Sequence, residues 1–272
     1  KRFMDLLVIP NIDNEYKRER AQDELPQSAG GRTIMTTEPK FVPNEAVGIT
    51  VGDNIKLNVR LVDCAETSYA RLITQLFGEQ MYISNATGCS SIWGNPAATS
   101  PYTVNKDSKK GPAWSNSLFE DNAEHGFGMY LGQKTLRDQL IAQVEEMAAS
   151  DKASDDFKAA AAKYLETKND TKANTPAADA LIAELEKAAK DGCPVAPQIL
   201  AKKNFLAKKS VWIFGGDGWA YDIGFGGLDH VLASGENVNV FVFDTEMYSN
   251  TGGQASKASN IGEVCQFADI LG

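Results

Sequence analysis

The sequence is poor in the residues that build disulfide scaffolds and transition-metal sites. It contains four cysteines and two histidines among 272 residues. The cysteines are scattered, at Cys64, Cys89, Cys193 and Cys265, and no two of them form a C-x-x-C pair. This pattern excludes a secreted disulfide framework, a zinc ribbon and a His-rich metal site, and it predicts a reducing compartment.

Positive charge and long apolar runs are also scarce. Lys and Arg number 27 against 36 Asp and Glu, so the net charge is −9. Nucleic acids and anionic membranes are therefore not expected as partners. No apolar run reaches the roughly 18 residues of a transmembrane helix, and no signal peptide is recognised near Lys1. The hydrophobic share of 43% nevertheless predicts a globular protein with a sizeable core.

Residues 1–60 are the least informative part of the chain. Two short runs, at 47–51 and 55–59, have the pattern of strands, and Gly52-Asp53-Asn54 between them suits a hairpin turn. We interpret 1–60 as a β-rich N-terminal extension to which the sequence assigns no function.

Residues 61–272 have the pattern of an α/β domain. Apolar spacing predicts a helix over 66–77, and buried strands are predicted at 81–85, 211–214 and 238–243. The last two strands flank a predicted helix over 223–234, so they should be parallel neighbours. Residues 94–116 are predicted to be a long loop, and 134–209 a helical insertion in which 169–176 separates two helices. The expected fold is a mostly parallel sheet with helices on both faces.

The sharpest chemical signal is the turn Gly216-Asp217-Gly218 after a predicted strand. Two glycines let a backbone approach a diphosphate closely, and a bound diphosphate needs a hard cation such as Mg²⁺. Asp217 can supply a carboxylate oxygen, and the turn after the next strand can add the Thr245 hydroxyl and the Met247 carbonyl. The same tripeptide is also a common turn without any ligand. A dinucleotide fingerprint fits poorly, because Gly224-Phe225-Gly226-Gly227 lacks a glycine at the required spacing.

Several longer strings resemble the thiamine-diphosphate module of pyruvate:ferredoxin (flavodoxin) oxidoreductases. The likeness covers about Cys64 to Asp269. It is carried by Ala86-Thr87-Gly88-Cys89-Ser90-Ser91-Ile92-Trp93-Gly94, by Gly111-Pro112-Ala113-Trp114-Ser115-Asn116-Ser117-Leu118-Phe119-Glu120-Asp121-Asn122-Ala123-Glu124, by Gly215-Gly216-Asp217-Gly218-Trp219-Ala220-Tyr221-Asp222-Ile223-Gly224, and by Asp244-Thr245-Glu246-Met247-Tyr248-Ser249-Asn250-Thr251-Gly252-Gly253-Gln254.

The resemblance implies a role for each matching residue. Asp217, Thr245 and the Met247 carbonyl match Mg²⁺ ligands, and Asn250 matches a polar residue beside the reacting carbon and the substrate. Contacts with thiamine diphosphate are implied for Gly88, Cys89, Ser90, Ser91, Gly216, Gly218 and Trp219.

The resemblance also implies a reaction and its partners. The expected reaction is oxidative decarboxylation of pyruvate to acetyl-coenzyme A, with electrons leaving singly through iron–sulfur clusters to ferredoxin or flavodoxin. The implied setting is a homodimer containing the remaining domains of the enzyme, located in the cytoplasm or in an anaerobic organelle.

The cysteines depart from the family pattern. The family holds its nearest [4Fe–4S] cluster with a C-x-x-C pair, a third cysteine 25 residues later and a fourth much later. Cys64 and Cys89 match the second and third positions, whereas Leu61 occupies the first. A [4Fe–4S] cluster usually takes four thiolates, so two matching cysteines are too few for a cluster held by this chain alone.

Two alternatives stay open from the sequence. One is a non-redox, decarboxylase-type thiamine-diphosphate enzyme, which the leucine at position 61 favours. The other is an inactive fragment, because these 272 residues lack the family's partner domain, which binds the aminopyrimidine of the cofactor.

Overall fold

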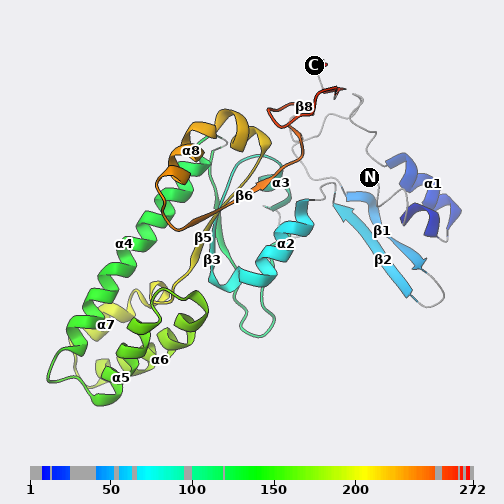
Figure 1. Ribbon diagram of the computed structural model, residues 1–272. Helices are drawn as coiled ribbons and strands as arrows, with labels where there is room; N and C mark the ends of the chain where they lie inside the picture. Colours follow the sequence, from blue (N-terminus) through cyan, green and yellow to red (C-terminus); the bar gives the residue numbers. More distant parts are fainter. Residues whose placement is uncertain are drawn as a thin grey trace.

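The computed structural model describes most of the chain and shows three parts: a parallel sheet with its helices, a helical bundle and a separate hairpin (Figure 1). The described residues are 8–12, 14–24, 41–51, 55–62, 66–94, 100–118, 120–248, 253–262, 264–265 and 268–269.

The central element is a four-stranded sheet in which every neighbouring pair of strands is parallel. The strand order is β4-β3-β5-β6. The strands are β3 (Met81–Asn85), β4 (Ala113–Asn116), β5 (Ser210–Gly216) and β6 (Val238–Phe243). The structure confirms the three predicted strands, but β6, at the edge of the sheet, is mostly half-buried rather than buried. The structure also corrects the prediction that 94–116 is loop throughout. β4 is only four residues long and half exposed, so it lacks the apolar run that would have revealed it.

Helices cover both faces of this sheet, as the sequence predicts for an α/β fold. Helix α2 (Glu66–Phe77) packs on one face, while α4 (Asn122–Ala148) and α8 (Phe225–Ala233) pack on the other. Successive side chains of β5 point to opposite faces of the sheet. Ile213 therefore packs beside Leu228 of α8, and Phe214 lies in the cluster that contains Ala70 of α2.

Helix α4 begins at Asn122, 14 residues before the apolar stripe that the sequence shows at 136–147. Its first half contains three glycines, which weaken the helical signal. Gly126 is required by packing: a Cβ there would lie 2.5 Å from Cγ1 of Ile213 on β5. The close approach of helix and sheet therefore explains the glycine that obscured the helix.

The helical insertion has a core of its own. It comprises the second half of α4 together with α5 (Asp155–Glu166), α6 (Thr171–Lys190) and α7 (Ala196–Leu200), which cluster at the far end of α4 from α8 (Figure 1). Its fully buried side chains include Leu140, Val144, Phe157, Tyr164, Leu181, Leu185 and Ile199. This confirms the predicted insertion.

The expected separator at 169–176 is wrong in its extent. Helix α6 begins at Thr171, because the side chain of Asp170 accepts hydrogen bonds from the N–H groups of Lys172 and Ala173 and caps the helix. Pro176 lies in the second turn of this helix, where its missing N–H costs one backbone hydrogen bond.

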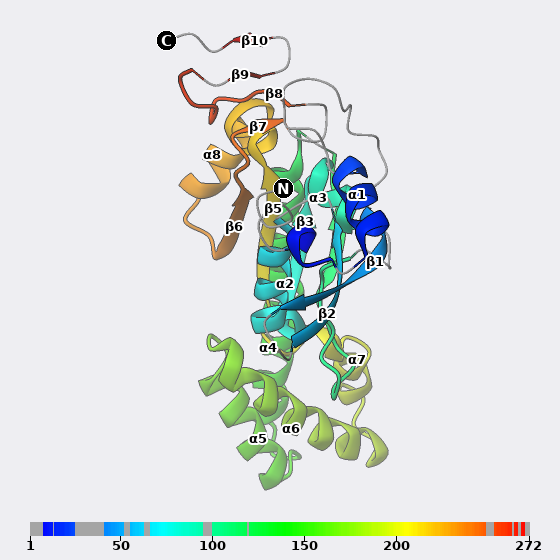
Figure 2. The same cartoon turned by 90° about the vertical axis from the view of Figure 1, so that its right-hand side faces the viewer.

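The described N-terminal residues form a hairpin and a helix, which Figure 1 shows to one side of the main sheet and Figure 2 shows in front of it. Strands β1 (Phe41–Val51) and β2 (Ile55–Val62) pair antiparallel, which confirms the two predicted strand segments. The turn predicted at 52–54 lies outside the described residues. A 3₁₀ turn, η2 (Ile9–Asn11), and α1 (Glu15–Glu24) accompany the hairpin, and Ile12 bridges to Ile49 of β1.

The remaining elements are short. They are η3 (Gly78–Gln80), α3 (Cys89–Gly94), η4 (Lys203–Phe205), the π-helical turn η5 (Gly218–Ile223), β7 (Met247–Tyr248), β8 (Gln254–Ala255), β9 (Val264–Cys265) and β10 (Ala268–Asp269). Among the described helices, none has the length and apolarity needed to cross a bilayer.

Candidate functional site

The two glycine turns singled out by the sequence lie at the same edge of the sheet. Gly88 comes three residues after β3, and Gly216 is the last residue of β5. These strands are parallel neighbours, and beyond the ladder the Ala86 N–H donates to the Phe214 carbonyl over 2.8 Å. The carboxyl edge of a parallel sheet is where such folds bind ligands, so the prediction of one shared edge is confirmed.

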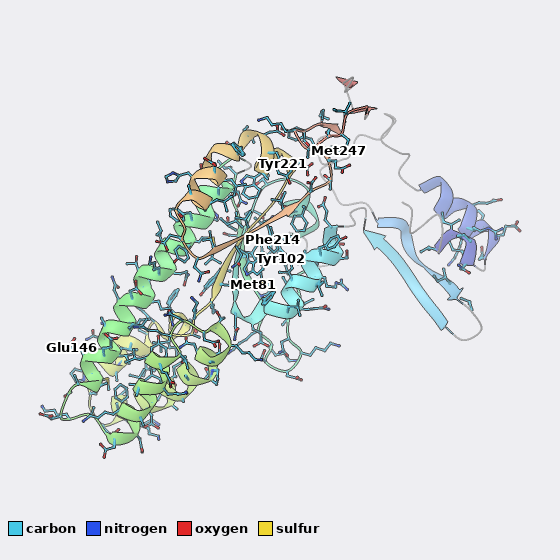
Figure 3. All side chains as sticks on the ribbon, in the orientation of Figure 1. Met81, Tyr102, Glu146, Phe214, Tyr221 and Met247 are labelled. Atoms are coloured by element: carbon cyan, nitrogen blue, oxygen red, sulfur yellow. The ribbon has the colours of Figure 1, made fainter. Side chains whose placement is uncertain are left out.

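The oxygens of Asp217, Thr245 and Met247 meet at this edge. Asp217 is only 2% exposed, and its Oδ1 accepts a 2.8 Å hydrogen bond from the Thr245 N–H. The Thr245 hydroxyl oxygen lies 3.4 Å from the same Oδ1 and donates over 3.0 Å to the Met247 carbonyl. In Figure 3, Met247 lies at the same end of the sheet as Tyr221, with Phe214 and Met81 successively further from that end.

These spacings fit the ligand shell of a magnesium ion. In octahedral coordination at 2.0–2.1 Å, neighbouring ligand oxygens lie about 2.9 Å apart. The two O–O distances here, 3.0 and 3.4 Å, are near that value. A carboxylate, a hydroxyl and a main-chain carbonyl are all hard oxygen donors, so the three groups suit Mg²⁺.

A strained turn brings Thr245 and Met247 together. Glu246, between them, has φ of 63°, a left-handed conformation that non-glycine residues rarely adopt. The Asp244 carboxylate holds the turn by accepting a 3.1 Å hydrogen bond from the Glu246 N–H, and the Ser259 hydroxyl donates to the Glu246 carbonyl. Strain of this kind is found at sites that need one fixed geometry.

The local electrostatics favour a cation. Burial raises the pKa of the Asp217 carboxyl, the Thr245 N–H bond opposes this shift, and the negative charge of Asp244 adds to it. Nearby, burial and the Asp222 carboxylate raise the pKa of Tyr248 to about 12. A divalent cation beside Asp217 would relieve both the repulsion from Asp244 and the cost of burying the charge.

The turn after β3 uses its serines internally. The Ser91 hydroxyl accepts from the Gly88 N–H over 2.9 Å and lies 2.8 Å from the Gly88 carbonyl, and the Ser90 hydroxyl donates to the Ala86 carbonyl over 3.2 Å. Both serines are buried. As placed, these side chains shape the loop, and their predicted contacts with a cofactor remain predictions.

Trp219 lies in the core beneath the site. Its side chain is fully buried, and Cβ atoms added at Gly215 or Gly224 would each lie 2.4 Å from the indole ring. A contact between Trp219 and a cofactor therefore stays a prediction. Because the ring is buried, such a contact would involve the main chain of Trp219.

Several predicted site residues lie outside what the structure describes. Asn250 and Cys64 are outside the described ranges, and the backbone of Cys89, but not its side chain, is described at the start of α3. Their predicted roles remain predictions. Within the described ranges, no three His, Cys, Asp or Glu side chains gather, which is compatible with a predicted Mg²⁺ site that has a single carboxylate ligand.

The structure adds residues that the sequence did not single out. The Ser256 hydroxyl donates over 3.2 Å to Oδ2 of Asp217, because β8 folds back onto β7. The Tyr221 hydroxyl donates to Asp244 over 3.0 Å. Ser256 lies in none of the matching strings, and Tyr221 lies in one but had no role assigned to it, since each contact joins positions more than twenty residues apart. A cavity of about 570 Å³ lined by Gln80 and Lys110 lies at the opposite, amino end of the strands and is not this site.

Comparison with known proteins finds similarity to two different families. The pyruvate-flavodoxin oxidoreductase of Klebsiella pneumoniae is 54% identical over 205 residues, which is 75% of this chain and 17% of the relative. The pyruvate:ferredoxin oxidoreductase of Moorella thermoacetica is 52% identical over 209 residues, covering 75% of the chain and 18% of the relative. Three quarters of this chain is homologous to a segment of pyruvate oxidoreductases.

The homology extends to an enzyme of pyruvate whose name specifies NADP(+). The mitochondrial pyruvate dehydrogenase [NADP(+)] of Euglena gracilis is 50% identical over 210 residues, 75% of this chain and 11% of the relative. The chain thus spans less than a fifth of the length of these oxidoreductases. The resemblance stated from the motifs is confirmed as homology.

Residues 1–75 match a different family, described as "Stage IV sporulation protein A, ATPase domain". This match covers the hairpin and most of α2, and it includes Leu61, which stands where the oxidoreductase pattern has a cysteine. The sequence motifs had suggested no relative for residues 1–60. The boundary predicted at residue 61 stays a prediction, since the match runs past it.

Proposed function

We propose that the α/β part of this chain binds thiamine diphosphate through Mg²⁺ and serves as the cofactor-binding part of a pyruvate:ferredoxin or pyruvate-flavodoxin oxidoreductase. The observation that carries the proposal is the meeting of the Asp217 carboxylate, the Thr245 hydroxyl and the Met247 carbonyl at the carboxyl edge of the sheet. The homology to oxidoreductases that act on pyruvate supports it independently.

Each residue has a physical task in this proposal. Asp217, Thr245 and Met247 hold the cation, which in turn neutralises the diphosphate. Gly216 and Gly218 flank Asp217 without side chains, so the backbone can approach a phosphate group closely. The buried Ser91 keeps the Gly88 turn in one conformation at the neighbouring strand.

The cofactor itself would supply an electron sink for the carbon that loses CO₂. We assign Asn250, three residues after Met247, to the substrate side of the site on the resemblance. For the whole protein we propose pyruvate as the 2-oxo acid, coenzyme A as the acyl acceptor and flavodoxin or ferredoxin as the electron acceptor. The names of the relatives support pyruvate and the two electron carriers.

The proposal is tested by the substitution Asp217→Ala. Asp217 gives the only charged protein ligand in the proposed set, so its loss should weaken Mg²⁺-dependent binding of thiamine diphosphate at least a hundredfold. A hydrogen bond or ligand involving a buried charge is worth about 1.5–3 kcal/mol, and the metal multiplies this effect. Isothermal titration calorimetry with the cofactor at saturating Mg²⁺ measures the change.

The matched control is Asp229→Ala, which removes the same charge from an exposed position on α8. It should leave the affinity within about twofold of wild type, because the charge of an exposed side chain is screened by water and salt. Equal affinities for the wild type and Asp217→Ala would refute the ligand assignment. No binding by the wild type at any Mg²⁺ concentration would favour the inactive-fragment alternative.

We further propose that the chain alone holds no [4Fe–4S] cluster. Cys64 and Cys89 match two of the family's four ligand positions, and Leu61 lies in the segment that matches the sporulation ATPase family. That second match supports the proposal, because a segment related to another family need not contain a cluster ligand.

The substitution Leu61→Cys should restore the C-x-x-C pair and raise the ligand count to three, which some clusters tolerate with an outside fourth ligand. Anaerobic reconstitution, iron counting and electron paramagnetic resonance should show a cluster in this variant and none in the wild type. Near four irons per wild-type chain, with a reduced-cluster signal, would contradict the expectation. A chain that binds thiamine diphosphate but never a cluster would favour the non-redox alternative.

A further inference from the structure

Asn122 is a fully buried amide that joins three parts of the sheet. It is the first residue of α4, and its Nδ2 donates over 2.8 Å to the Phe214 carbonyl of β5. Its Oδ1 accepts from the Ser84 hydroxyl of β3 over 2.6 Å and from the Ser117 hydroxyl just after β4 over 2.9 Å. One side chain therefore contacts three adjacent strands or their ends.

On the β3 side, the hydrogen-bond network around Asn122 continues through Ser84 to His125. Ser84 is fully buried, and its oxygen lies 2.7 Å from Nδ1 of His125. A serine has one proton to donate, so if Ser84 donates to Asn122, then His125 carries its proton on Nδ1 and donates to Ser84. The amide orientation is thus fixed by partners on both sides.

The Phe214 carbonyl connects the two chain segments that lead to the Gly88 and Asp217 turns. It accepts the Asn122 amide and also the Ala86 N–H, each over 2.8 Å. Ala86 lies two residues before Gly88, and Phe214 lies three residues before Asp217. Asn122 therefore fixes the spacing between the start of the Gly88 turn and the start of the Asp217 turn.

Asn174 in the helical insertion provides an internal comparison. It is also fully buried, and its Oδ1 accepts from the Lys208 N–H over 2.8 Å and from Arg137 over 3.2 Å. Its Nδ2 lies 3.3 Å from the Tyr164 carbonyl and so donates as the Asn122 amide does. The two amides are alike in burial and bonding, but only the partners of Asn122 lead into the candidate site.

We propose that Asn122 is a positioning residue, which holds the Gly88 and Asp217 turns at the separation that a Mg²⁺-bound diphosphate requires. This role rests on the proposed function. Asn122 itself touches no ligand in this scheme and acts through Phe214, Ser84 and Ser117.

The test compares Asn122→Asp with Asn174→Asp. Each change keeps the side-chain volume and replaces a donating NH₂ with an oxygen that cannot donate while the carboxyl group is ionised. Cofactor affinity is measured by calorimetry with thiamine diphosphate and Mg²⁺, at a temperature where circular dichroism shows both variants folded. We expect about tenfold weaker binding for Asn122→Asp and less than a twofold change for Asn174→Asp. Equal affinity for Asn122→Asp and wild type, or equal losses in both variants, would overturn the proposal.

A milder variant covers the case in which Asn122→Asp does not fold. Ser117→Ala removes one hydrogen bond to Oδ1 and leaves the bond from Nδ2 to Phe214 in place. It should weaken cofactor binding about two- to threefold while the chain remains folded. An unchanged affinity in this variant would count against positioning through the network.

Hydrogen exchange separates this proposal from the proposed function. The Ala86 N–H bonds to Phe214, and the Thr245 N–H bonds to Asp217. In Asn122→Asp without cofactor, both amides should exchange at least tenfold faster relative to Ile213 in the middle of β5, with no such change in Asn174→Asp. If the wild type binds no thiamine diphosphate, the proposed function fails, and unchanged exchange at these two amides would overturn the positioning role by itself.

Discussion

Trp219 packs directly against Gly215 and Gly224, and neither position has room for a side chain. A Cβ at Gly215 would lie 2.4 Å from Cε3 of Trp219 and 3.0 Å from Cβ of Ala86. The indole fills the space behind the Gly216-Asp217-Gly218 turn, so its position and that of the turn are coupled. The second glycine, Gly224, meets the other side of the same ring.

We therefore expect Gly215→Ala to destabilise the protein by about 2–3 kcal/mol, because the indole must leave its pocket. Denaturant unfolding gives the free energy, and a red shift of tryptophan fluorescence would report the displaced ring. Gly128→Ala on the exposed side of α4 is the control, since nothing lies within 4 Å of its added Cβ. It should stabilise by about 0.5–1 kcal/mol, as alanine replaces glycine in a helix. Similar losses in both variants would contradict the packing argument.

At the residue scale, a site residue next to a predicted strand can be predicted from the sequence. A residue whose role depends on contacts with distant parts of the chain cannot. Asp217 was predictable because two glycines and a buried strand surround it. Asn122 was not, because its partners Ser84 and Phe214 are 38 and 92 residues away along the chain. No local pattern encodes such a contact, so it becomes visible only when the strands are placed side by side.

At the scale of elements, the helical insertion and the α/β part have separate cores. The insertion buries Phe157, Tyr164 and Leu181 against one another, whereas the sheet packs Ile213 and Phe214 against its own helices. Only α4 belongs to both, with Ala123 in one cluster and Leu140 in the other. Damage to the core of the insertion should therefore leave the candidate site intact.

The substitution Leu181→Ala tests this separation. Leu181 is fully buried, so truncation should cost about 2–5 kcal/mol in the free energy of unfolding through lost burial and the cavity that remains. The affinity for thiamine diphosphate should stay within twofold of wild type at a temperature where the variant is folded. Leu131→Ala, at a position 40% exposed on α4, should cost less than about 1 kcal/mol. A large loss of affinity in Leu181→Ala would show that the two cores are coupled.

Elements with regular apolar patterns were predicted, and those shaped by packing were not. Strands β3, β5 and β6 each carry an apolar run that is visible in the sequence, although β6 is mostly half-buried in the structure. The first half of α4 was missed because Gly126 is needed for close approach to Ile213. The start of α6 was missed because Pro176 suggested a break, whereas the Asp170 cap starts the helix upstream of it.

At the scale of the whole molecule, the chain matches two different families. Residues 1–75 match the ATPase domain of a sporulation protein, and three quarters of the chain matches pyruvate oxidoreductases. The structure has a corresponding division: β1 and β2 pair with each other, and they share no ladder with the four-stranded sheet. Within the described residues, the main contacts of β1 beyond β2 are with η2 and α1.

This division predicts that the oxidoreductase-like part folds without the N-terminal hairpin. In a chain that starts at Ala65, α2 keeps its whole length, and Ala70 still packs against Met81 and Phe214. No strand of the four-stranded sheet loses a partner, so its hydrogen bonding is unchanged.

Calorimetric unfolding of the truncated chain should show a main transition within a few degrees of that of the full chain, since a loss of 1 kcal/mol shifts the unfolding temperature of a domain of this size by about 2–4 °C. The affinity for Mg²⁺ and thiamine diphosphate should match that of the full chain within twofold. A truncated chain that unfolds at a much lower temperature would show that the hairpin supports the sheet through contacts beyond those of the described residues.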